Sequence, residues 1–209
     1  MEPGREIDLY NAEPAGVIEH DDHLEAFFDD REIAAMFGDP VPCEEIDWVQ
    51  RNYDAWPPLL IGEKFFLIAP WRNDPTPAGR LRLEINPGMQ CGTGWHRCTQ
   101  LCLEAMERAL RPGDSVLDVG TGSGILSIAA KLLGAGRVVA CDIDPDATRA
   151  APFFIGSVDA VKSDSFDLVV ANISEPVIRA LRADLERVAR VRILSGFQDQ
   201  NGEWTCLVC

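Results

Sequence analysis

A glycine-rich turn between two apolar segments constrains the fold of this chain more than any other feature. Residues 115–119 read Ser-Val-Leu-Asp-Val, residues 120–124 read Gly-Thr-Gly-Ser-Gly, and apolar side chains recur with helical spacing over residues 125–133. We therefore expect a buried strand, a tight turn and a helix. Glycine suits such a turn because the backbone reverses sharply and a ligand can approach without meeting a Cβ atom. The spacing is G-x-G-x-G, because Ile125 stands where a dinucleotide-binding turn has its last glycine.

The apolar pattern on both sides of this turn predicts an α/β fold. Helices are expected at residues 98–110, at 125–133, from Asp144-Pro145 onward, and from an N-cap at Ser174. Strands are expected at residues 115–119, 137–141, 153–155, 166–171, 191–195 and 204–209. Apolar strands that alternate with helices imply a parallel sheet covered by helices on both faces.

The N-terminal part of the chain differs in charge. Residues 1–50 contain 15 Asp and Glu but only two Arg, so they hold −13 of the formal net charge of −15. Strand-like segments at residues 15–19 and 64–69 and a helix-like segment at 23–36 predict a small α+β appendage. The acidic residues either form a solvated face or contact a basic partner, and the sequence leaves both open.

Composition argues against several classes of protein. No apolar run approaches the length of a membrane span, and no basic start with an apolar core marks the N-terminus for secretion. The negative charge disfavours direct binding to nucleic acid. Seven cysteines, an odd number, indicate buried, reduced thiols in a cytoplasmic protein. Cys206 and Cys209 lie on a predicted strand and point to opposite faces, so we expect no metal site there. The oligomeric state stays open.

A second carboxylate points to a nucleoside ligand. Asp142 ends the predicted strand that follows the glycine turn, 22 residues after Gly120. A carboxylate at that position can accept two hydrogen bonds from a ribose diol. We expect Asp144, which precedes Pro145, to cap the next helix, so that Asp142 is free for the sugar.

Together, Asp118, the three glycines and Asp142 resemble the Rossmann-like (class I) methyltransferases that use S-adenosylmethionine. The likeness extends over residues 95–195. It implies S-adenosylmethionine as the cofactor and a sheet of the class I type.

A closer resemblance precedes this core. Residues 86–99 read N-P-G-M-Q-C-G-T-G-W-H-R-C-T, which is similar to the D-P-G-x-A-F-G-T-G-x-H-x-T-T pattern of the PrmA-type enzymes that methylate ribosomal protein L-eleven. Segments within residues 47–71 and the V-A-N-I at 170–173 also match that family. The resemblance implies a substrate-recognition-like region at 1–46, a linker at 47–94 and a methyltransferase domain at 95–209.

The resemblance also implies a set of site residues. Asn172 would orient the acceptor amine, and His96 would line the pocket or accept a proton. Neither a metal nor a covalent nucleophile is required. The cofactor would contact Thr99, Asp118, Gly120, Thr121, Gly122, Gly124, Asp142, Ile143 and Asn172.

The chain departs from the family pattern in two ways. Gln90-Cys91 and Cys98 replace Ala-Phe and Thr, which affects the substrate wall more than the cofactor. The connections at residues 145–152 and 197–203 are short for the helices expected there. Either peripheral elements have been lost, or residues are absent from the sequence; the second is favoured because a family-like segment resumes after each gap.

These features predict an S-adenosylmethionine-dependent N-methyltransferase that acts on Lys or N-terminal amines of a basic ribosomal protein. Two alternatives stay open. The acceptor could be another protein or a small molecule, or the chain could be a non-catalytic cofactor-binding protein that serves as an interaction module.

Overall fold

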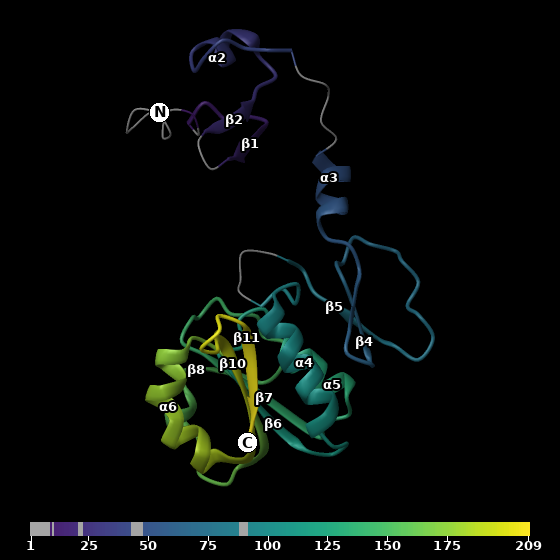
Figure 1. Ribbon diagram of the computed structural model, residues 1–209, viewed down its shortest axis with the longest axis vertical. Coiled ribbons are helices and arrows are strands. Elements are labelled where there is room, and N and C mark those ends of the chain that lie inside the picture. The colour runs from purple at the N-terminus through teal and green to yellow at the C-terminus, as the bar shows by residue number, and fades with distance from the viewer. Residues whose placement is uncertain (1–8, 10, 21–22, 43–47, 88–91) are drawn as a thin grey trace. The chain divides into compact units, whose positions relative to one another are not determined.

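The computed structural model describes residues 9, 11–20, 23–42, 48–87 and 92–209 (Figure 1). The chain divides into two compact units, an N-terminal unit, Met1–Trp48, and a C-terminal unit, Val49–Cys209. Of the helices in the described ranges, none has the length and apolar character that crossing a membrane requires.

The N-terminal unit contains an antiparallel hairpin of β1 (Gly16–Glu19) and β2 (Leu24–Phe27), followed by the short helix α2 (Arg31–Ala35). The strand expected near residues 15–19 is confirmed. The helix expected over 23–36 is wrong for its first half, because residues 24–27 pair with β1 instead. Val17 and Ile18 favour a strand, and pairing across the hairpin outweighs the weak helical spacing.

A six-stranded sheet forms the centre of the C-terminal unit, in the order β11-β10-β9-β6-β7-β8. All neighbouring strands are parallel except β11, which runs antiparallel to β10. The strands are β6 (Ser115–Val119), β7 (Arg137–Asp142), β8 (Phe153–Ile155), β9 (Phe166–Asn172), β10 (Ala189–Gln198) and β11 (Trp204–Val208). The predicted strands are confirmed, and the predicted parallel pairing holds for every pair of neighbouring strands except β10 with β11.

Helices cover both faces of this sheet (Figure 1). On one face lie α4 (Arg97–Ala109) and α5 (Ile125–Leu132), and on the other lies α6 (Glu175–Val188), next to the 3-10 turn η1 (Val158–Ala160). Their apolar sides are fully buried, as Met106 on α4 and Val188 on α6 illustrate. Ser174 is the N-cap of α6, as expected. The predicted α/β fold with helices on both faces is therefore confirmed.

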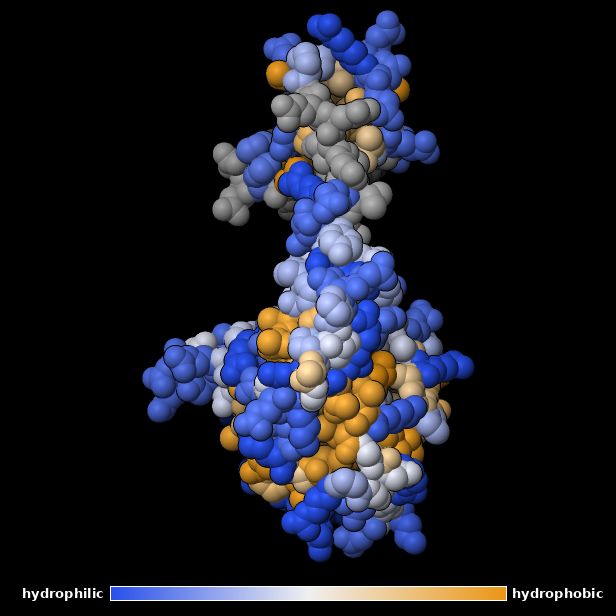
Figure 2. All heavy atoms as spheres, turned by 90° about the vertical axis from the view of Figure 1, so that its right-hand side faces the viewer, coloured by the Kyte–Doolittle hydropathy of each residue, from blue (hydrophilic) through white to orange (hydrophobic). Residues whose placement is uncertain are grey.

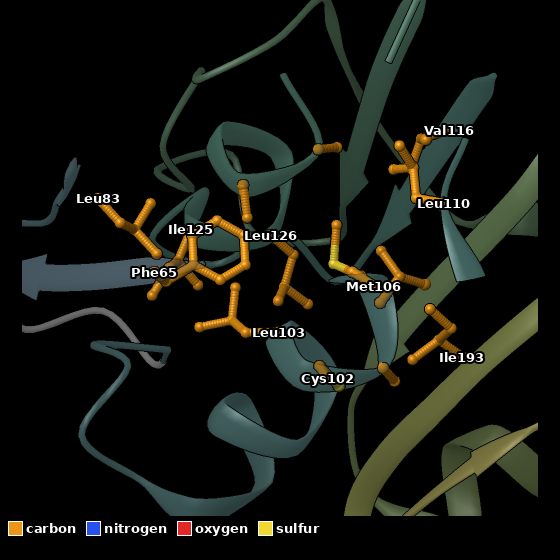
Figure 3. Close-up of a cluster of buried hydrophobic side chains, with 14 of the residues drawn as sticks. Phe65, Leu83, Cys102, Leu103, Met106, Leu110, Val116, Ile125, Leu126 and Ile193 are labelled. Atoms are coloured by element: carbon orange, nitrogen blue, oxygen red, sulfur yellow. The ribbon is translucent and has the colours of Figure 1, made fainter. Parts of the chain in front are cut away.

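A smaller sheet packs onto the same helical layer. It consists of β3 (Leu59–Ile61), β4 (Phe65–Ile68) and β5 (Leu81–Glu84) in that order. Figure 3 shows Phe65 and Leu83 of this sheet against Leu103 and Ile125 of the helices. In Figure 2, hydrophobic residues gather on the visible face of this unit, on the side where Figure 1 shows β4, β5 and α5.

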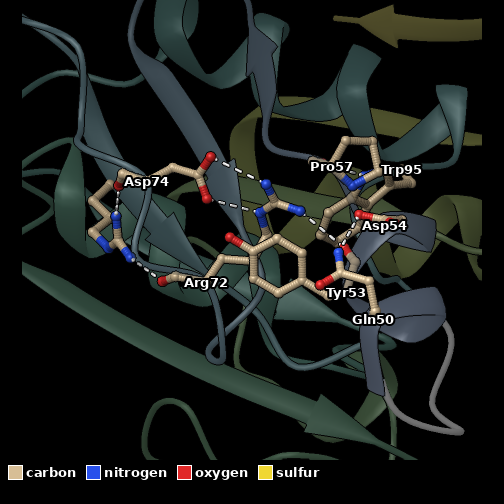
Figure 4. A network of polar contacts seen from close by, with 8 residues as sticks. Gln50, Tyr53, Asp54, Pro57, Arg72, Asp74 and Trp95 are labelled. Carbon is tan, nitrogen blue, oxygen red and sulfur yellow. Dashed lines mark hydrogen bonds and ion pairs between the residues drawn. The ribbon is translucent and has the colours of Figure 1, made fainter. Parts of the chain in front are cut away.

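A polar network holds α3 (Trp48–Ala55) to the loop between β4 and β5 (Figure 4). The guanidinium of Arg72 lies 4.0 Å from the centre of the Tyr53 ring and donates to the Tyr53 carbonyl at 2.9 Å. It also donates to both oxygens of Asp74, at 2.8 and 3.1 Å, which lowers the pKa of that carboxyl. This network ties α3 to the loop that follows β4.

The helix expected from Asp144-Pro145 is absent, and that prediction is wrong. Residues 143–152 form turns, and Asp144 Oδ1 accepts a hydrogen bond from Asp146 N at 2.9 Å. The reason is the register of β8, whose three residues pair only with Ala140–Asp142 at the end of β7. After the end of β7, the chain needs to run back over only about three residues of strand, roughly 10 Å, before β8 begins. A turn spans that distance, so no helix is needed. At residues 197–203, a hairpin turn joins β10 directly to β11.

Candidate cofactor and active site

The glycine turn has the backbone that its sequence predicts. Gly120, Gly122 and Gly124 have φ values of +71°, +50° and +78°, which side chains other than glycine rarely adopt. A Cβ on Gly120 would collide with Ile173, and one on Gly124 would lie 2.6 Å from the Cβ of Ala150. The turn therefore tolerates only glycine at these two positions.

Asp118 is completely buried near the end of β6, two residues before Gly120. Its Oδ2 accepts hydrogen bonds from the hydroxyls of Thr121 and Ser127, both at 2.7 Å. Burial raises the pKa of the carboxyl, and these two hydrogen bonds oppose the shift. Its Oδ1 has no partner among the described residues. Through Oδ2, Asp118 thus links β6 to the glycine turn and to α5, and its Oδ1 stays available for a hydrogen-bond donor.

The role of Ser127 was not predicted from the sequence. This serine is fully buried on α5, on a helix side that is otherwise apolar. A polar residue at a core position needs a hydrogen-bond partner. Ser127 could on this ground have been paired with Asp118, the other polar residue that the pattern places in the core.

Asp142 ends β7 and is held by the backbone. Its Oδ2 accepts from Gly122 N at 2.9 Å, and its Oδ1 accepts from Asp144 N at 3.0 Å. Each carboxylate oxygen can accept two hydrogen bonds, so each keeps one free direction. The next residue, Ile143, exposes 80% of its surface beside this carboxylate. The arrangement presents a fixed carboxylate next to an exposed apolar side chain.

Asn172 and Thr99 are 73 positions apart in sequence, and the fold brings them into contact. Asn172 Nδ2, at the end of β9, donates to Thr99 Oγ1 in the first turn of α4 at 3.0 Å. Asn172 Oδ1 is buried and has no partner among the described residues. Asp118 pairs in register with Val170, two residues before Asn172, so Asp118 and Asn172 share the face that α4 and α5 cover.

His96 is the N-cap of α4. Its Nδ1 accepts from Cys98 N at 3.3 Å and lies 2.8 Å from Cys98 Sγ. The ring is exposed and stands edge-on to Trp204, with ring centres 4.4 Å apart. Only Nε2 remains for a ligand.

The predicted site residues thus gather at one edge of the sheet, where β6, β7 and β9 end. This edge presents two carboxylates and an amide oxygen. Such a set suits a ligand that carries hydrogen-bond donors and positive charge better than it suits a phosphate. Two hollows of about 740 and 510 Å³, at β2–α2 and between α6 and β10, include none of these residues.

The cysteines follow the prediction only in part. Cys98, Cys102 and Cys141 are buried free thiols, as expected, but Cys206 is half-buried and Cys209 is exposed. Both lie on or after β11, which is at the edge of the sheet and pairs with β10. Cys43 and Cys91, like Gln90, lie outside the described residues. In the described ranges, no group of three or more His, Cys, Asp or Glu could hold a metal ion.

Comparison with known protein families gives one result over most of the chain. A model of the family described as ribosomal protein L11 methyltransferase (PrmA) matches residues 19–203. Proteins named ribosomal protein L11 methyltransferase are similar to this chain. The one from Cupriavidus necator is 38% identical over an alignment of 185 residues, and the match covers 79% of this chain and 61% of that protein. The one from Burkholderia mallei is 45% identical over an alignment of 139 residues, and the match covers 62% of this chain and 46% of that protein.

A solved structure agrees with this result. The ribosomal protein L11 methylase from Lactobacillus delbrueckii subsp. bulgaricus superposes with a TM-score of 0.61 at 26% identity. The match covers 72% of this chain and 96% of that one. The chain spans about three fifths, or less, of the length of the curated relatives named above.

Proposed function

The chain belongs to the ribosomal protein L11 methyltransferase family, and from this premise we propose that it is an S-adenosylmethionine-dependent N-methyltransferase. The acceptor in this proposal is ribosomal protein L11, methylated on Lys side chains or on its N-terminal amine. The family match supports the reaction class, and the residues at the sheet edge support the location of the site.

One observation supports the cofactor most directly. Asp118 Oδ1 and Asn172 Oδ1 are buried acceptors without a partner among the described residues, and they lie on the same face of adjacent strands. Buried polar groups are almost always hydrogen-bonded, so such atoms indicate a missing donor. S-adenosylmethionine carries an ammonium group, two ribose hydroxyls and a sulfonium charge. The residues present therefore fit this cofactor.

The other proposed contacts follow from what each residue offers. The two free directions of the Asp142 carboxylate would accept the ribose hydroxyls. Ile143 would pack against the adenine, because an exposed isoleucine beside the ribose site gains from contact with an aromatic ring. Gly120, Gly122 and Gly124 would let the cofactor approach the backbone, and Thr121 would act by holding Asp118 in place.

Asn172 is the proposed catalytic residue. Bound at this edge, S-adenosylmethionine would supply an electrophilic methyl group. Asn172 Oδ1 would accept an N–H of the incoming amine and aim its lone pair at that methyl group. Thr99 fixes the amide, because its hydroxyl accepts from Nδ2 and so keeps Oδ1 directed at the site. Positioning of this kind can supply much of a methyl-transfer rate. His96 would line the pocket through Nε2, its only uncommitted nitrogen.

The acidic N-terminal region suits a basic ribosomal protein, which would place the reaction in the cytoplasm. In this proposal residues 1–46 recognise the substrate, residues 47–94 link, and residues 95–209 carry out the transfer. Electrostatic attraction between residues 1–50, with their net charge of −13, and a basic protein would chiefly speed association. Nucleic acid and membranes have no part in the proposal, and the oligomeric state stays open.

Two measurements test the proposal. Isothermal titration should give saturable binding of S-adenosylmethionine and of its demethylated product, S-adenosylhomocysteine. Transfer of a radioactive methyl group, measured over a panel of purified ribosomal proteins, should label L11. Asn172→Ala removes one proposed cofactor contact and should weaken cofactor binding, and at saturating cofactor it should still slow transfer about 100-fold, the cost of a misplaced reacting group.

Each other outcome favours a different alternative. Binding with transfer to another protein or to a small molecule would show that the changed wall at Gln90–Thr99 selects a different acceptor. Binding without transfer to any acceptor would favour a non-catalytic interaction module. If neither S-adenosylmethionine nor S-adenosylhomocysteine gives a heat of binding, every function that depends on this cofactor is excluded.

A further inference from the structure

A chain of hydrogen bonds leads from the surface to Asn172 through the start of α4. His96 Nδ1 lies 2.8 Å from Cys98 Sγ, which in turn lies 4.0 Å from Thr99 Oγ1. Thr99 Oγ1 lies 3.0 Å from Asn172 Nδ2. The His96 ring is exposed, whereas Cys98 and Thr99 are buried. These four residues, which we call the His96–Asn172 chain, thus connect solvent to the proposed catalytic amide.

The two ends of the His96–Asn172 chain determine the direction of its hydrogen bonds. The backbone N–H of Cys98 also donates to His96 Nδ1, at 3.3 Å, and a backbone N–H can only donate. Nδ1 is therefore an unprotonated acceptor, and the Cys98 thiol donates its single proton to it. At the other end, Asn172 Nδ2 can only donate.

The two middle groups then have a single arrangement. Because the Cys98 thiol has given its proton to His96, its sulfur can only accept, and the Thr99 hydroxyl donates to it. With its proton committed, the Thr99 oxygen can only accept from the Asn172 amide. The amide therefore turns its NH₂ group to Thr99 and its Oδ1 away from it. In agreement, Asn172 Oδ1 is buried and has no partner among the described residues, so it is available to a ligand.

We propose that Cys98 is a positioning residue for methyl transfer, which acts through Thr99 to keep Asn172 Oδ1 directed at the acceptor amine. This role rests on the proposed function. Without the thiol, the Thr99 hydroxyl has an uncommitted proton that it can donate to Asn172 Oδ1, and the amide can turn over. The incoming amine would then meet an NH₂ group, which cannot accept its N–H.

The same chain restricts what His96 can do. A neutral imidazole carries its proton on one nitrogen only. Since Nδ1 accepts from Cys98, Nε2 holds the proton and can donate but not accept. The edge-on contact with Trp204, with ring centres 4.4 Å apart, opposes rotation of the imidazole away from Cys98. His96 is thus a second positioning residue, and it does not take the proton of the acceptor amine.

A pair of substitutions of equal shape tests the role of Cys98. Thr and Val differ only in that Thr has a hydroxyl, which can donate to His96 and accept from Thr99. The full chain is assayed at saturating S-adenosylmethionine with the acceptor that the wild-type protein methylates. Cys98→Thr should keep kcat within about twofold of wild type, whereas Cys98→Val should lower it about tenfold, as expected for one broken buried hydrogen bond.

The matched control is Cys102→Val, the same substitution one turn later on α4 at a fully buried residue outside the His96–Asn172 chain. This variant should keep the wild-type kcat. If Cys98→Thr or Cys98→Val does not fold, the smaller pair Cys98→Ser and Cys98→Ala makes the same comparison.

Nuclear magnetic resonance tests the chain without any turnover. In protein labelled with ¹⁵N at histidine, His96 should show a protonated Nε2 and an unprotonated Nδ1 at a pH that keeps the ring neutral. His96→Gln identifies its signals among those of the three histidines. The Nδ1 signal should move in Cys98→Val, which removes one of its two donors, and should move less in Cys98→Thr.

Three results would overturn the proposal. The first is an equal kcat in Cys98→Thr and Cys98→Val, and the second is an equal loss of kcat in Cys102→Val and Cys98→Val. The third is a protonated His96 Nδ1, because the Cys98 thiol would then have no acceptor there. If the wild-type protein transfers no methyl group, the proposed function fails and the positioning role fails with it. The His96 signals would still decide whether the chain of hydrogen bonds is present.

Discussion

The two units of the chain differ in how their secondary structure is stabilised. In the C-terminal unit, helices and strands bury continuous apolar clusters on both faces of the sheet. In the described part of the N-terminal unit, Leu9 is the only buried residue, and most other side chains are exposed or half-buried. Burial therefore specifies the elements of one unit, whereas local pairing and capping specify those of the other.

The contrast extends to function. Every residue of the candidate site lies in the C-terminal unit, and most of the negative charge lies in the N-terminal one. If this division is real, changes in one unit should leave the properties of the other intact.

The largest expected effect is on stability. Met106→Ala removes a fully buried side chain from the core of the C-terminal unit and should lower the free energy of unfolding by about 2–5 kcal/mol. Met36→Ala, the same change at a residue 69% exposed in the N-terminal unit, should alter it by less than about 0.5 kcal/mol. Urea unfolding followed by tryptophan fluorescence measures both. Equal losses would contradict the contrast.

The next effect is on cofactor binding. Asp142→Ala should weaken binding of S-adenosylhomocysteine by about 1.5–3 kcal/mol, roughly 10- to 150-fold, because it removes charge-assisted hydrogen bonds to the ribose. Asp144→Ala is the matched control in the same loop, and Asp29→Ala is the control in the N-terminal unit. Both should bind like wild type in isothermal titration. Wild-type affinity in Asp142→Ala would mean that the ribose lies elsewhere.

Asp118 should make the stability of the C-terminal unit depend on pH. Burial raises its pKa above the ordinary value of 3.8 in the folded state only. The stability that its protonated form contributes is full below pH 3.8 and is lost as pH rises through the folded pKa.

In the Asp118→Asn variant the side chain cannot ionise, so this loss of stability with rising pH should not occur. Relative to wild type, the variant should therefore gain stability as pH rises above about 4, by about 1–3 kcal/mol in total. Urea unfolding of both proteins from pH 4 to pH 8 measures this difference. A difference that does not change with pH would exclude the buried carboxyl as its source.

The smallest expected effect is local. Asp30 caps α2 in the N-terminal unit, where its Oδ1 accepts from Glu32 N at 2.7 Å. Asp30→Ala should destabilise this short helix by about 0.5–2 kcal/mol. Hydrogen exchange of the Glu32 and Ile33 amides should accelerate, while amides of α4 and α5 exchange as before. Faster exchange in α4 would show that the units are coupled.

Sequence patterns predicted the fold of the C-terminal unit well because burial repeats with the period of each element. The strand at 115–119 and the helices near 98–110 and 125–133 are confirmed within one or two residues. The two wrong predictions lie where little is buried. The segment at 24–27 forms a strand because it pairs with β1, and the segment after Asp144 needs no helix because β8 is short.

The candidate site shows the same division between local and distant effects. The glycine conformations and the carboxylates at strand ends follow from local sequence, because parallel strands end at one edge. The contact of Asn172 with Thr99, the burial of Asp118 against Ser127, and the N-cap role of His96 were not predicted.

Local sequence was thus enough to establish the alternation of helices and strands, the glycine turn and the family, because each depends on residues close together in the chain. Long-range packing alone established which oxygens lack partners and which hydroxyl holds the Asn172 amide. These depend on the register of β6 with β9 and on the position of α4 above them. No window of sequence contains that information, because Thr99 and Asn172 are 73 residues apart.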